Sequence, residues 1–268
     1  MKDLLDYLKN ELSSEVSEVV LEDARIGLVY TGVLLSSGHA AVAYTPIQEL
    51  HECPVIDYAG SITGTEASEI MKMALSPNLV EAAVGIATVN ALSQIVFETY
   101  PEKYVFSDVD VLDLIQPQDK VTMVGYFGPL IPKILEKTNL IYVLEKRTID
   151  DDRVKLVHPS HASKALSNSE VVLISGSTLV NKTVNKILKQ VTNARESVLL
   201  GPTASITPQP FFKKGATAVM GVKITDPQKM LQVVSEAGGT RQLLSTCAEK
   251  TAFLKETNER HKILLQPI

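Results

Sequence analysis

Tryptophan is absent from this sequence, aromatic residues make up only 5% of it, and it has only two cysteines. With so few rings, we expect a mainly aliphatic core. Cys53 and Cys247 can form neither a disulfide framework nor a CxxC motif, which favours a reducing compartment and a cytoplasmic protein. Acidic residues as early as Asp3 argue against a secretory signal peptide. No apolar run reaches the roughly 18 residues that a membrane-spanning helix requires, so we expect no membrane span.

Charge is distributed unevenly along the 268 residues. Residues 1–116 hold 5 Lys and Arg against 18 Asp and Glu, a net charge of −13, whereas residues 117–268 hold 21 against 13, a net charge of +8. Either each half has a solvated surface of its own sign, or the halves attract across a cleft and the basic half holds an anionic ligand. No basic run interleaves with aromatic residues and the pI is 5.6, so we expect no nucleic-acid partner.

The first part of the chain has the pattern of an α+β domain. Residues 3–12 place leucines along one stripe of a helix. Residues 25–35 and 39–44 read as two strands, and the Ser-Ser-Gly sequence at 36–38 supplies the turn of a hairpin. Residues 79–99, rich in Ala, Val, Leu and Ile, form the strongest predicted helix.

Two polar residues, Thr88 and Asn90, interrupt the small and apolar middle of that predicted helix. Asn90 could cap a neighbouring element within close helix packing, which is the structural alternative. Both side chains could instead face a cleft between two domains and contact a ligand. We therefore keep Thr88 and Asn90 as candidate ligand contacts.

The second part of the chain alternates strands with helical patterns. Strands are expected at residues 121–124, 140–144, 171–174, 198–200 and 218–220, and helical patterns at 131–137, 162–166, 179–191, 208–213 and 227–236. This alternation predicts an α/β Rossmann-like domain with a mostly parallel sheet of five or more strands, covered on both faces. We expect two domains, residues 1–105 and 106–268.

Ligands of such sheets bind beyond the carboxyl ends of the strands, so the loops at that edge are the candidate site. Loops rich in glycine and hydroxyl groups can hold an anion, although the same residues are ordinary helix N-caps. The first loop departs from GxGxxG, so its dinucleotide signal is weak. The candidate ligand contacts in these loops are Gly125, Tyr126, Phe127, Ser175, Gly176, Ser177, Thr178, Asn181, Thr183, Gly201, Pro202, Thr203, Gly239 and Thr240.

Glu145 is the candidate after the second strand. It lies about 20 residues beyond Gly125, the spacing at which a Rossmann carboxylate meets a ribose hydroxyl. The alternative is a surface carboxylate paired with Lys146 or Arg147. Near the end of the chain, Arg241 could pair with a phosphate or a carboxylate.

Candidates for metal ligands are few. His51 with Cys53, and His158 with His161, each lack a third ligand at a recognised spacing, so we expect both pairs to be structural or solvated. A group of aspartates at positions 108, 110 and 113 could cap a short helix or bind a hard cation such as magnesium.

An ordered set of short segments covers nearly the whole chain. The segments are RIGLVYT at 25–31, AYT at 43–45, GIATVNAL at 85–92, VGYFGPLI at 124–131, VLE at 143–145, SGSTLVNKT at 175–183, LGPT at 200–203 and GGT at 238–240. In these segments the chain resembles a family named "putative heavy-metal chelation". The resemblance implies an enolase-N-terminal-like first domain, a Rossmann-like second domain and a site in the cleft between them.

Two functions from different classes follow from these observations. The first is a cytoplasmic small-ligand-binding protein, linked to heavy-metal chelation or homeostasis, that holds a transition metal or a metal complex in an interdomain cleft. The alternative is an enzyme or former enzyme that acts on a nucleotide-like or pterin-like ligand at the strand-end loops. Whether the chain catalyses a reaction stays open, because no activated nucleophile stands out. An aliphatic surface patch would favour a homodimer, and a vestigial cleft would favour an interaction scaffold.

Overall fold

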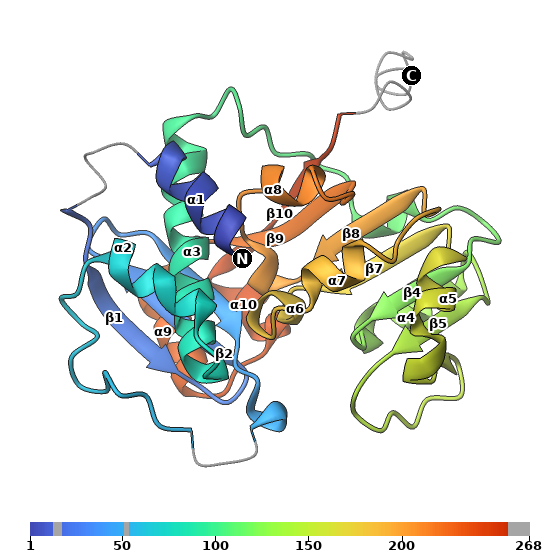
Figure 1. Ribbon diagram of the computed structural model, residues 1–268, viewed down its shortest axis with the longest axis horizontal. Helices are drawn as coiled ribbons and strands as arrows, with labels where there is room; N and C mark the ends of the chain where they lie inside the picture. The colour runs from blue at the N-terminus through green and yellow to red at the C-terminus, as the bar shows by residue number, and fades with distance from the viewer. Residues whose placement is uncertain (13–17, 51–53, 257–268) are drawn as a thin grey trace.

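The computed structural model describes residues 1–12, 18–50 and 54–256 (Figure 1). It is an α/β structure with a seven-stranded sheet and a separate three-stranded antiparallel sheet. The α-helices are α1 (Lys2–Glu11), α2 (Ala67–Ile70), α3 (Leu79–Thr99), α4 (Ile131–Leu135), α5 (Ala162–Ser167), α6 (Ser177–Val180), α7 (Val184–Leu188), α8 (Gln209–Phe212), α9 (Pro227–Ser235) and α10 (Thr240–Thr246). The strands are β1 (Leu21–Ile26), β2 (Tyr30–Leu35), β3 (Ala40–Tyr44), β4 (Val121–Val124), β5 (Ile141–Leu144), β6 (Lys155–Leu156), β7 (Val171–Ser175), β8 (Glu196–Leu200), β9 (Ala218–Ile224) and β10 (Ala248–Leu254).

The large sheet has the strand order β10-β9-β8-β7-β4-β5-β6, and only β10 runs antiparallel to its neighbour. The prediction of a mostly parallel sheet with five or more strands is therefore confirmed. From β4 the chain builds outward through β5 to β6, then returns to the other side of β4 to add β7, β8 and β9. The order thus reverses between β4 and β7, which is where open α/β sheets bind ligands.

Side chains of the central strands alternate between two hydrophobic cores. Val172 and Ile174 of β7 belong to the core that also contains much of α3, whereas Val171 and Leu173 face the core on the opposite side of the sheet. All four side chains are fully buried. A run of Val, Ile and Leu is what a strand covered on both faces requires.

The three-stranded sheet corrects one prediction. Residues 25–35 do not form a single strand, because the chain turns at Gly27, whose N–H donates to the carbonyl of Tyr30 at 2.9 Å. An ideal Cβ on Gly27 would lie 2.2 Å from the carbonyl oxygen of Val234, so this turn has no room for a side chain. The predicted hairpin with its turn at residues 36–38 is confirmed, since β2 pairs with β3.

Helix α3 begins and ends where the sequence predicts. Asn78 caps it by accepting hydrogen bonds from the backbone N–H groups of Val80 and Glu81. Nearly all of its length is buried. By length and composition α3 could cross a membrane, but 83% of its most apolar window is buried inside the molecule, as in the core helix of a globular fold.

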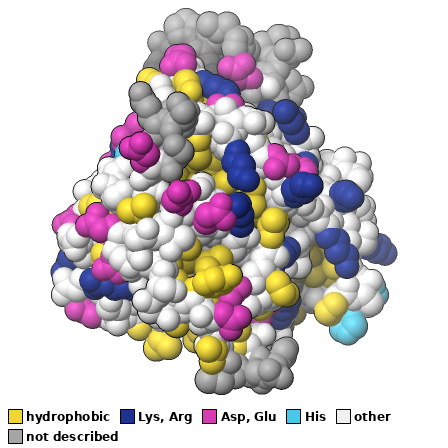
Figure 2. Space-filling view, turned by 60° about the vertical axis from the view of Figure 1, so that its left-hand side comes forward, with side chains coloured by type: hydrophobic (Ala, Val, Ile, Leu, Met, Phe, Trp, Pro, Cys, Tyr) yellow, Lys and Arg dark blue, Asp and Glu magenta, His cyan; other side chains and the backbone are white. Residues whose placement is uncertain are grey.

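Helices α9 and α10, from the second part of the chain, pack against the three-stranded sheet of the first part (Figure 1). Side chains of α9 and α10 share a core with residues of β2 and β3, including Leu34 and Val42. The face shown in Figure 2 carries mostly basic side chains on its right-hand side and most of its acidic ones towards the left and centre. Ion pairs join the acidic first part to the basic second part, with Asp3 to Lys214 at 3.0 Å and Glu98 to Lys223 at 3.1 Å.

Candidate functional site

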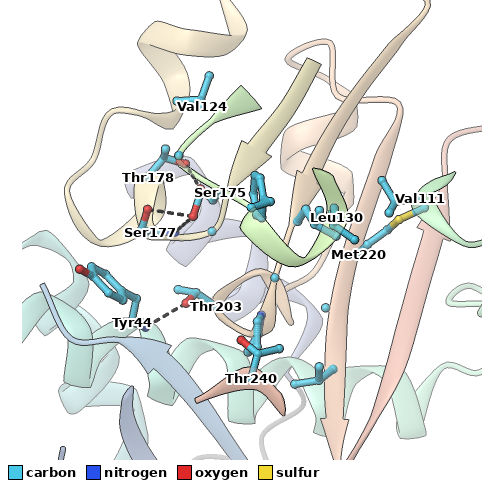
Figure 3. A pocket seen from close by; sticks show the side chains of 18 of the residues that line it. Tyr44, Val111, Val124, Leu130, Ser175, Ser177, Thr178, Thr203, Met220 and Thr240 are labelled. Carbon is cyan, nitrogen blue, oxygen red and sulfur yellow. Dashed lines mark hydrogen bonds between the residues drawn. The ribbon is translucent and has the colours of Figure 1, made fainter. Parts of the chain in front are cut away.

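A cavity of about 1240 Å³ lies at the carboxyl ends of the parallel strands. Its walls come from the loops after β4, β5, β7 and β8, from β9, and from Tyr30 and Tyr44 of the three-stranded sheet (Figure 3). The cavity therefore spans the point where the strand order reverses. Segments that are far apart in the sequence meet there.

Most of the sequence-predicted contacts line this cavity. They are Gly125, Tyr126, Phe127, Glu145, Ser175, Gly176, Ser177, Thr178, Asn181, Thr183, Gly201, Pro202, Thr203 and Thr240, and Arg241 lies with them. Gly239, although next to Thr240, is not part of the lining. The parallel sheet brings these loops together because the carboxyl ends of its strands share one edge.

Thr88 and Asn90 are buried in α3 and do not line the cavity. The Thr88 hydroxyl donates to the carbonyl of Val84 at 2.9 Å, within its own helix. The Asn90 amide nitrogen donates to the carbonyls of Val42 and Thr203, both at 3.0 Å. Asn90 thus ties β3 to the loop after β8, which is the structural alternative that the sequence offered.

Two glycines allow the strand-end loops to pack closely. Gly125 has a φ of 96°, and an ideal Cβ there would lie 2.8 Å from the Cβ of Ser175. An ideal Cβ on Gly176 would lie 2.8 Å from the Cβ of Thr203. Side chains at these positions would push apart the loops after β4, β7 and β8, so the glycines define this part of the wall.

Hydroxyl groups form a connected cluster on one wall (Figure 3). The Ser177 hydroxyl donates to the Ser175 hydroxyl at 2.9 Å, and the Thr178 hydroxyl donates to the carbonyl of Ser175 at 2.7 Å. The Thr203 hydroxyl accepts from the backbone N–H of Tyr44 at 2.9 Å, which fixes the three-stranded sheet to the strand-end loops. The cluster is held in place before any ligand enters.

Glu145 is deeply engaged in the wall, with its side chain only 14% exposed. One carboxylate oxygen accepts from the backbone N–H groups of Lys146 at 2.7 Å and Arg147 at 3.2 Å. The other accepts from the backbone N–H of Tyr126 at 3.2 Å and from the guanidinium of Arg147 at 3.0 Å. The predicted alternative of an ion pair with Arg147 is therefore realised, although at a cavity wall.

These contacts of Glu145 predict that the stability of the fold depends on pH. Burial alone would raise the pKa of Glu145, but the hydrogen bonds from Arg147 and the backbone outweigh it and lower that pKa below its usual 4.5. An acid with a lowered pKa stabilises the fold above its unfolded pKa and loses that contribution as the pH falls. Urea unfolding of Glu145→Gln should therefore show a deficit against wild type at pH 7 that shrinks below pH 4.5. A deficit that is constant between pH 7 and pH 3 would contradict this.

Further charged groups of the lining pair with one another. Glu49 forms an ion pair with Lys146 and accepts from the amide of Asn181 at 3.2 Å. Lys250 pairs with Asp110 at 2.8 Å. Asp110 also caps residues 111–114 with Asp113 in a capping box, so the capping alternative for this acidic group is confirmed.

Sequence reasoning did not select Tyr30, Tyr44, Glu49 or Arg147 as site residues. Tyr30 and Tyr44 face each other as a register pair of β2 and β3, and both line the cavity. The Tyr30 hydroxyl hydrogen-bonds that of Thr240 at 2.7 Å. Both tyrosines lie within segments that resemble the family, and this resemblance was the signal that could have identified them as site residues.

Of the two candidate pairs of soft-metal ligands, the structure describes only His158 with His161. His51 and Cys53 fall outside the described residues. His158 and His161 are exposed, with ring centroids 6.3 Å apart, and neither lines the cavity. Within residues 1–12, 18–50 and 54–256, no group of three or more His, Cys, Asp or Glu is placed to hold a metal ion. No described residue of the cavity lining is His or Cys.

Comparison with known proteins places the chain among relatives of unknown function. It is 29% identical over 245 residues to an uncharacterized protein of Methanocaldococcus jannaschii, covering 86% of this chain and 89% of that protein. A solved structure of a protein with unknown function from Pyrococcus horikoshii matches with a TM-score of 0.76 and 25% identity, over 94% of this chain and all of that one. Another, from Desulfitobacterium hafniense, has a TM-score of 0.79 at 19% identity over 95% and 99% of the two chains, and shows the shared fold.

Family models match both parts of the chain. One, described as "Putative heavy-metal chelation", matches residues 109–253, and a second with the same description matches residues 9–93. The solved structures from P. horikoshii and D. hafniense belong to the family of the first model. The chain therefore belongs to the family described as putative heavy-metal chelation.

Proposed function

We propose that this protein binds a small organic molecule in the strand-end cavity, and that its link to heavy metals is through a metal complex rather than a bare ion. The observation that carries this proposal is the cavity itself. Its volume of about 1240 Å³ exceeds the roughly 300–1,000 Å³ of most small-molecule sites, so a single ion would leave it almost empty.

The chemistry of the lining supports the same conclusion. Soft and borderline metals prefer thiolate and imidazole ligands, which the described lining does not supply. Two of the carboxylates at the cavity, Glu49 and Asp110, already form ion pairs with lysines, and Glu145 pairs with Arg147. An organic chelator would bring the metal ligands with it, and the protein would recognise the chelator through apolar, hydroxyl and charged groups.

The finer description of the fold belongs to this proposal. We assign residues 1–105 to an enolase-N-terminal-like domain and residues 106–268 to a Rossmann-like domain, so that the cavity is an interdomain cleft in a cytoplasmic protein. The strand order with its reversal between β4 and β7 supports the Rossmann-like assignment.

A nucleotide-like or pterin-like ligand, bound by an enzyme or former enzyme, is the second candidate. The observation that favours it is the position of the cavity at the reversal of strand order, where related sheets hold nucleotides. In the hydroxyl cluster, Ser177 and Thr178 donate to Ser175, so the Ser175 hydroxyl would donate to a polar group of such a ligand and the Ser177 and Thr178 oxygens would accept from one. The two candidates share the cavity and differ in the compound that fills it.

Thermal unfolding with one panel of compounds tests both candidates. The panel contains Zn²⁺ and Ni²⁺ as free ions, Ni²⁺ complexed with citrate or nitrilotriacetate, nucleotides and pterins. A compound at a hundred times its Kd stabilises by about 2.7 kcal/mol, which corresponds to roughly 5–11 °C in Tm at this chain length. We expect an organic compound or a metal complex to raise the Tm, and not a free ion.

A variant that fills the cavity gives the matched control. Ser177 is half-buried in the wall, and Ser177→Trp should remove the Tm rise that the bound compound causes in wild type. Ser163 is exposed on α5 away from the cavity, so Ser163→Trp should keep that rise. A rise that survives Ser177→Trp would place the compound elsewhere on the protein and count against the proposal.

A further inference from the structure

The hydrogen-bonding capacity of Glu145 is fully used. An ionised carboxylate offers about four lone-pair sites on its two oxygens. Four donors occupy them: the backbone N–H groups of Tyr126, Lys146 and Arg147, and the guanidinium of Arg147. A ligand hydroxyl could bond Glu145 only by displacing one of these donors. Glu145, which its spacing from Gly125 suggested as the acceptor of a ribose hydroxyl, therefore has no free acceptor site for a ligand.

The group that this carboxylate holds at the cavity is Arg147. Its guanidinium has five N–H donors, and the described structure engages only one of its terminal nitrogens, by Glu145. The Arg147 side chain is 47% exposed, and the residue lines the cavity. One terminal nitrogen of the guanidinium is thus fixed by an ion pair, while its other N–H donors stay available to a ligand.

The surroundings of Arg147 sharpen its role. The half-buried phenol of Tyr44 lies close enough that Arg147 opposes the rise that burial causes in the pKa of Tyr44. Lys146 and Lys250, two other cations of the lining, already pair with Glu49 and Asp110. Arg147 is the cation that the half-buried carboxylate of Glu145 holds in a fixed position, and a planar guanidinium suits two-point binding of a carboxylate or phosphate.

We propose that Arg147, positioned by Glu145, binds an anionic group of the ligand in this cavity, either a carboxylate or a phosphate. This inference rests on the proposed function, because it needs a ligand in the cavity. It assigns Arg147 as the binding residue and Glu145 as a positioning residue. Beside Arg147 and Glu145, the site then selects a ligand with an anionic group over one that offers only the neutral hydroxyl groups of a ribose.

Two pairs of compounds that differ only in the anion test the inference. AMP is compared with adenosine, and pterin-6-carboxylate with pterin, by measuring Kd with titration calorimetry. In wild type, at least one charged member should bind about ten- to a hundredfold more tightly than its neutral partner, the range of a charge-assisted hydrogen bond. A preference confined to the AMP pair identifies phosphate, and one confined to the pterin pair identifies carboxylate.

Substitution of Arg147 provides the decisive comparison. Arg147→Gln should abolish the preference for the charged member and leave the affinity for the neutral member within about twofold. Arg153 is the matched control, since it pairs with Asp151, also two residues earlier, through contacts of 2.8 Å, but does not line the cavity. Arg153→Gln should keep the preference. A preference that survives Arg147→Gln would overturn the inference.

Glu145→Gln tests the positioning role. It should reduce the ratio of charged to neutral affinity while leaving neutral binding unchanged, which general destabilisation would not do. A ratio that stays at its wild-type value would contradict the role assigned to Glu145. Equal binding of charged and neutral members by wild type would overturn the inference alone and leave the cavity proposal standing. Binding of neither member of either pair would count against the inference and against the nucleotide-like or pterin-like candidate, whereas the metal-complex candidate is tested by the thermal-unfolding panel.

Discussion

Replacement of Asn90 by aspartate is expected to destabilise the fold by about 3–5 kcal/mol, the loss typical of a buried group left without its partners. The Asn90 amide nitrogen donates to two backbone carbonyls, those of Val42 and Thr203, and the residue is fully buried. Aspartate would replace that donor with an oxygen that repels both carbonyls. Urea unfolding at pH 7 measures the loss directly.

The Asn90→Asp deficit should also depend on pH. Burial beside two carbonyl oxygens raises the pKa of the new carboxyl in the folded state above its unfolded value of about 4. The unfolded chain then releases its proton first, so stability should fall as the pH rises above about 4. Asn193→Asp is the matched control. The Asn193 amide nitrogen also donates to a backbone carbonyl, that of Ser167 at 2.8 Å, but it does so at an exposed site. An Asn90→Asp protein as stable as Asn193→Asp would contradict the described packing.

Gly85→Ala is the second substitution with a large expected effect. It should lower the free energy of unfolding by at least about 3 kcal/mol, at or above the upper end of the usual cost of overpacking a core. An ideal Cβ on Gly85 would lie 2.0 Å from the backbone nitrogen of Ala74 and 2.5 Å from the backbone carbon of Met73. Backbone atoms cannot move aside as a side-chain tip can. Alanine favours a helix over glycine by about 1 kcal/mol, which is too little to compensate.

Gly38→Ala is the control for this substitution. Gly38 has a φ of 83° in the β2–β3 turn, and a Cβ there would meet nothing within 4 Å. It should lose only about 1 kcal/mol, from backbone strain alone. If Gly85→Ala unfolds at the same urea concentration as Gly38→Ala, α3 does not approach residues 73 and 74 as closely as described.

The elements that sequence predicted best are those with strong local patterns. Helix α3 and strand β4 begin and end at the expected residues, because an apolar helix with an Asn cap and a short β-branched run need little tertiary information. Strand β10 was not predicted. It is an antiparallel edge strand in which Glu249 and Lys250 are exposed, so its apolar pattern is weak.

The break between α6 and α7 was also missed. The sequence suggested one helix over residues 179–191, but Lys182 adopts a φ of 62° and the chain turns there. Asn181 makes the turn, since its side-chain oxygen accepts from the backbone N–H of Thr183 at 3.3 Å and from the Thr183 hydroxyl at 2.7 Å. Asparagine was the available signal, because neither glycine nor proline marks the break.

The candidate site was predictable where topology alone decides it. Strand-end loops must share an edge of a parallel sheet, so Gly125, Ser175 and Thr203 converge as expected. Which residues of the first part of the chain reach that edge depends on how α3 and the three-stranded sheet pack. For this reason Tyr44 lines the cavity and Asn90 does not, a distinction that no local pattern contains.

Titration calorimetry distinguishes a site for a metal complex from a site for a bare ion most directly. The full chain and Ser177→Trp are titrated with Ni²⁺ in three forms: the free ion, the citrate complex and the nitrilotriacetate complex. We expect no stoichiometric micromolar binding of the free ion in the cavity, and we expect binding of an organic complex that Ser177→Trp abolishes. Stoichiometric binding of free Ni²⁺ at micromolar affinity or better, lost in Ser177→Trp, would show that the cavity is a site for the bare metal and not for a metal complex.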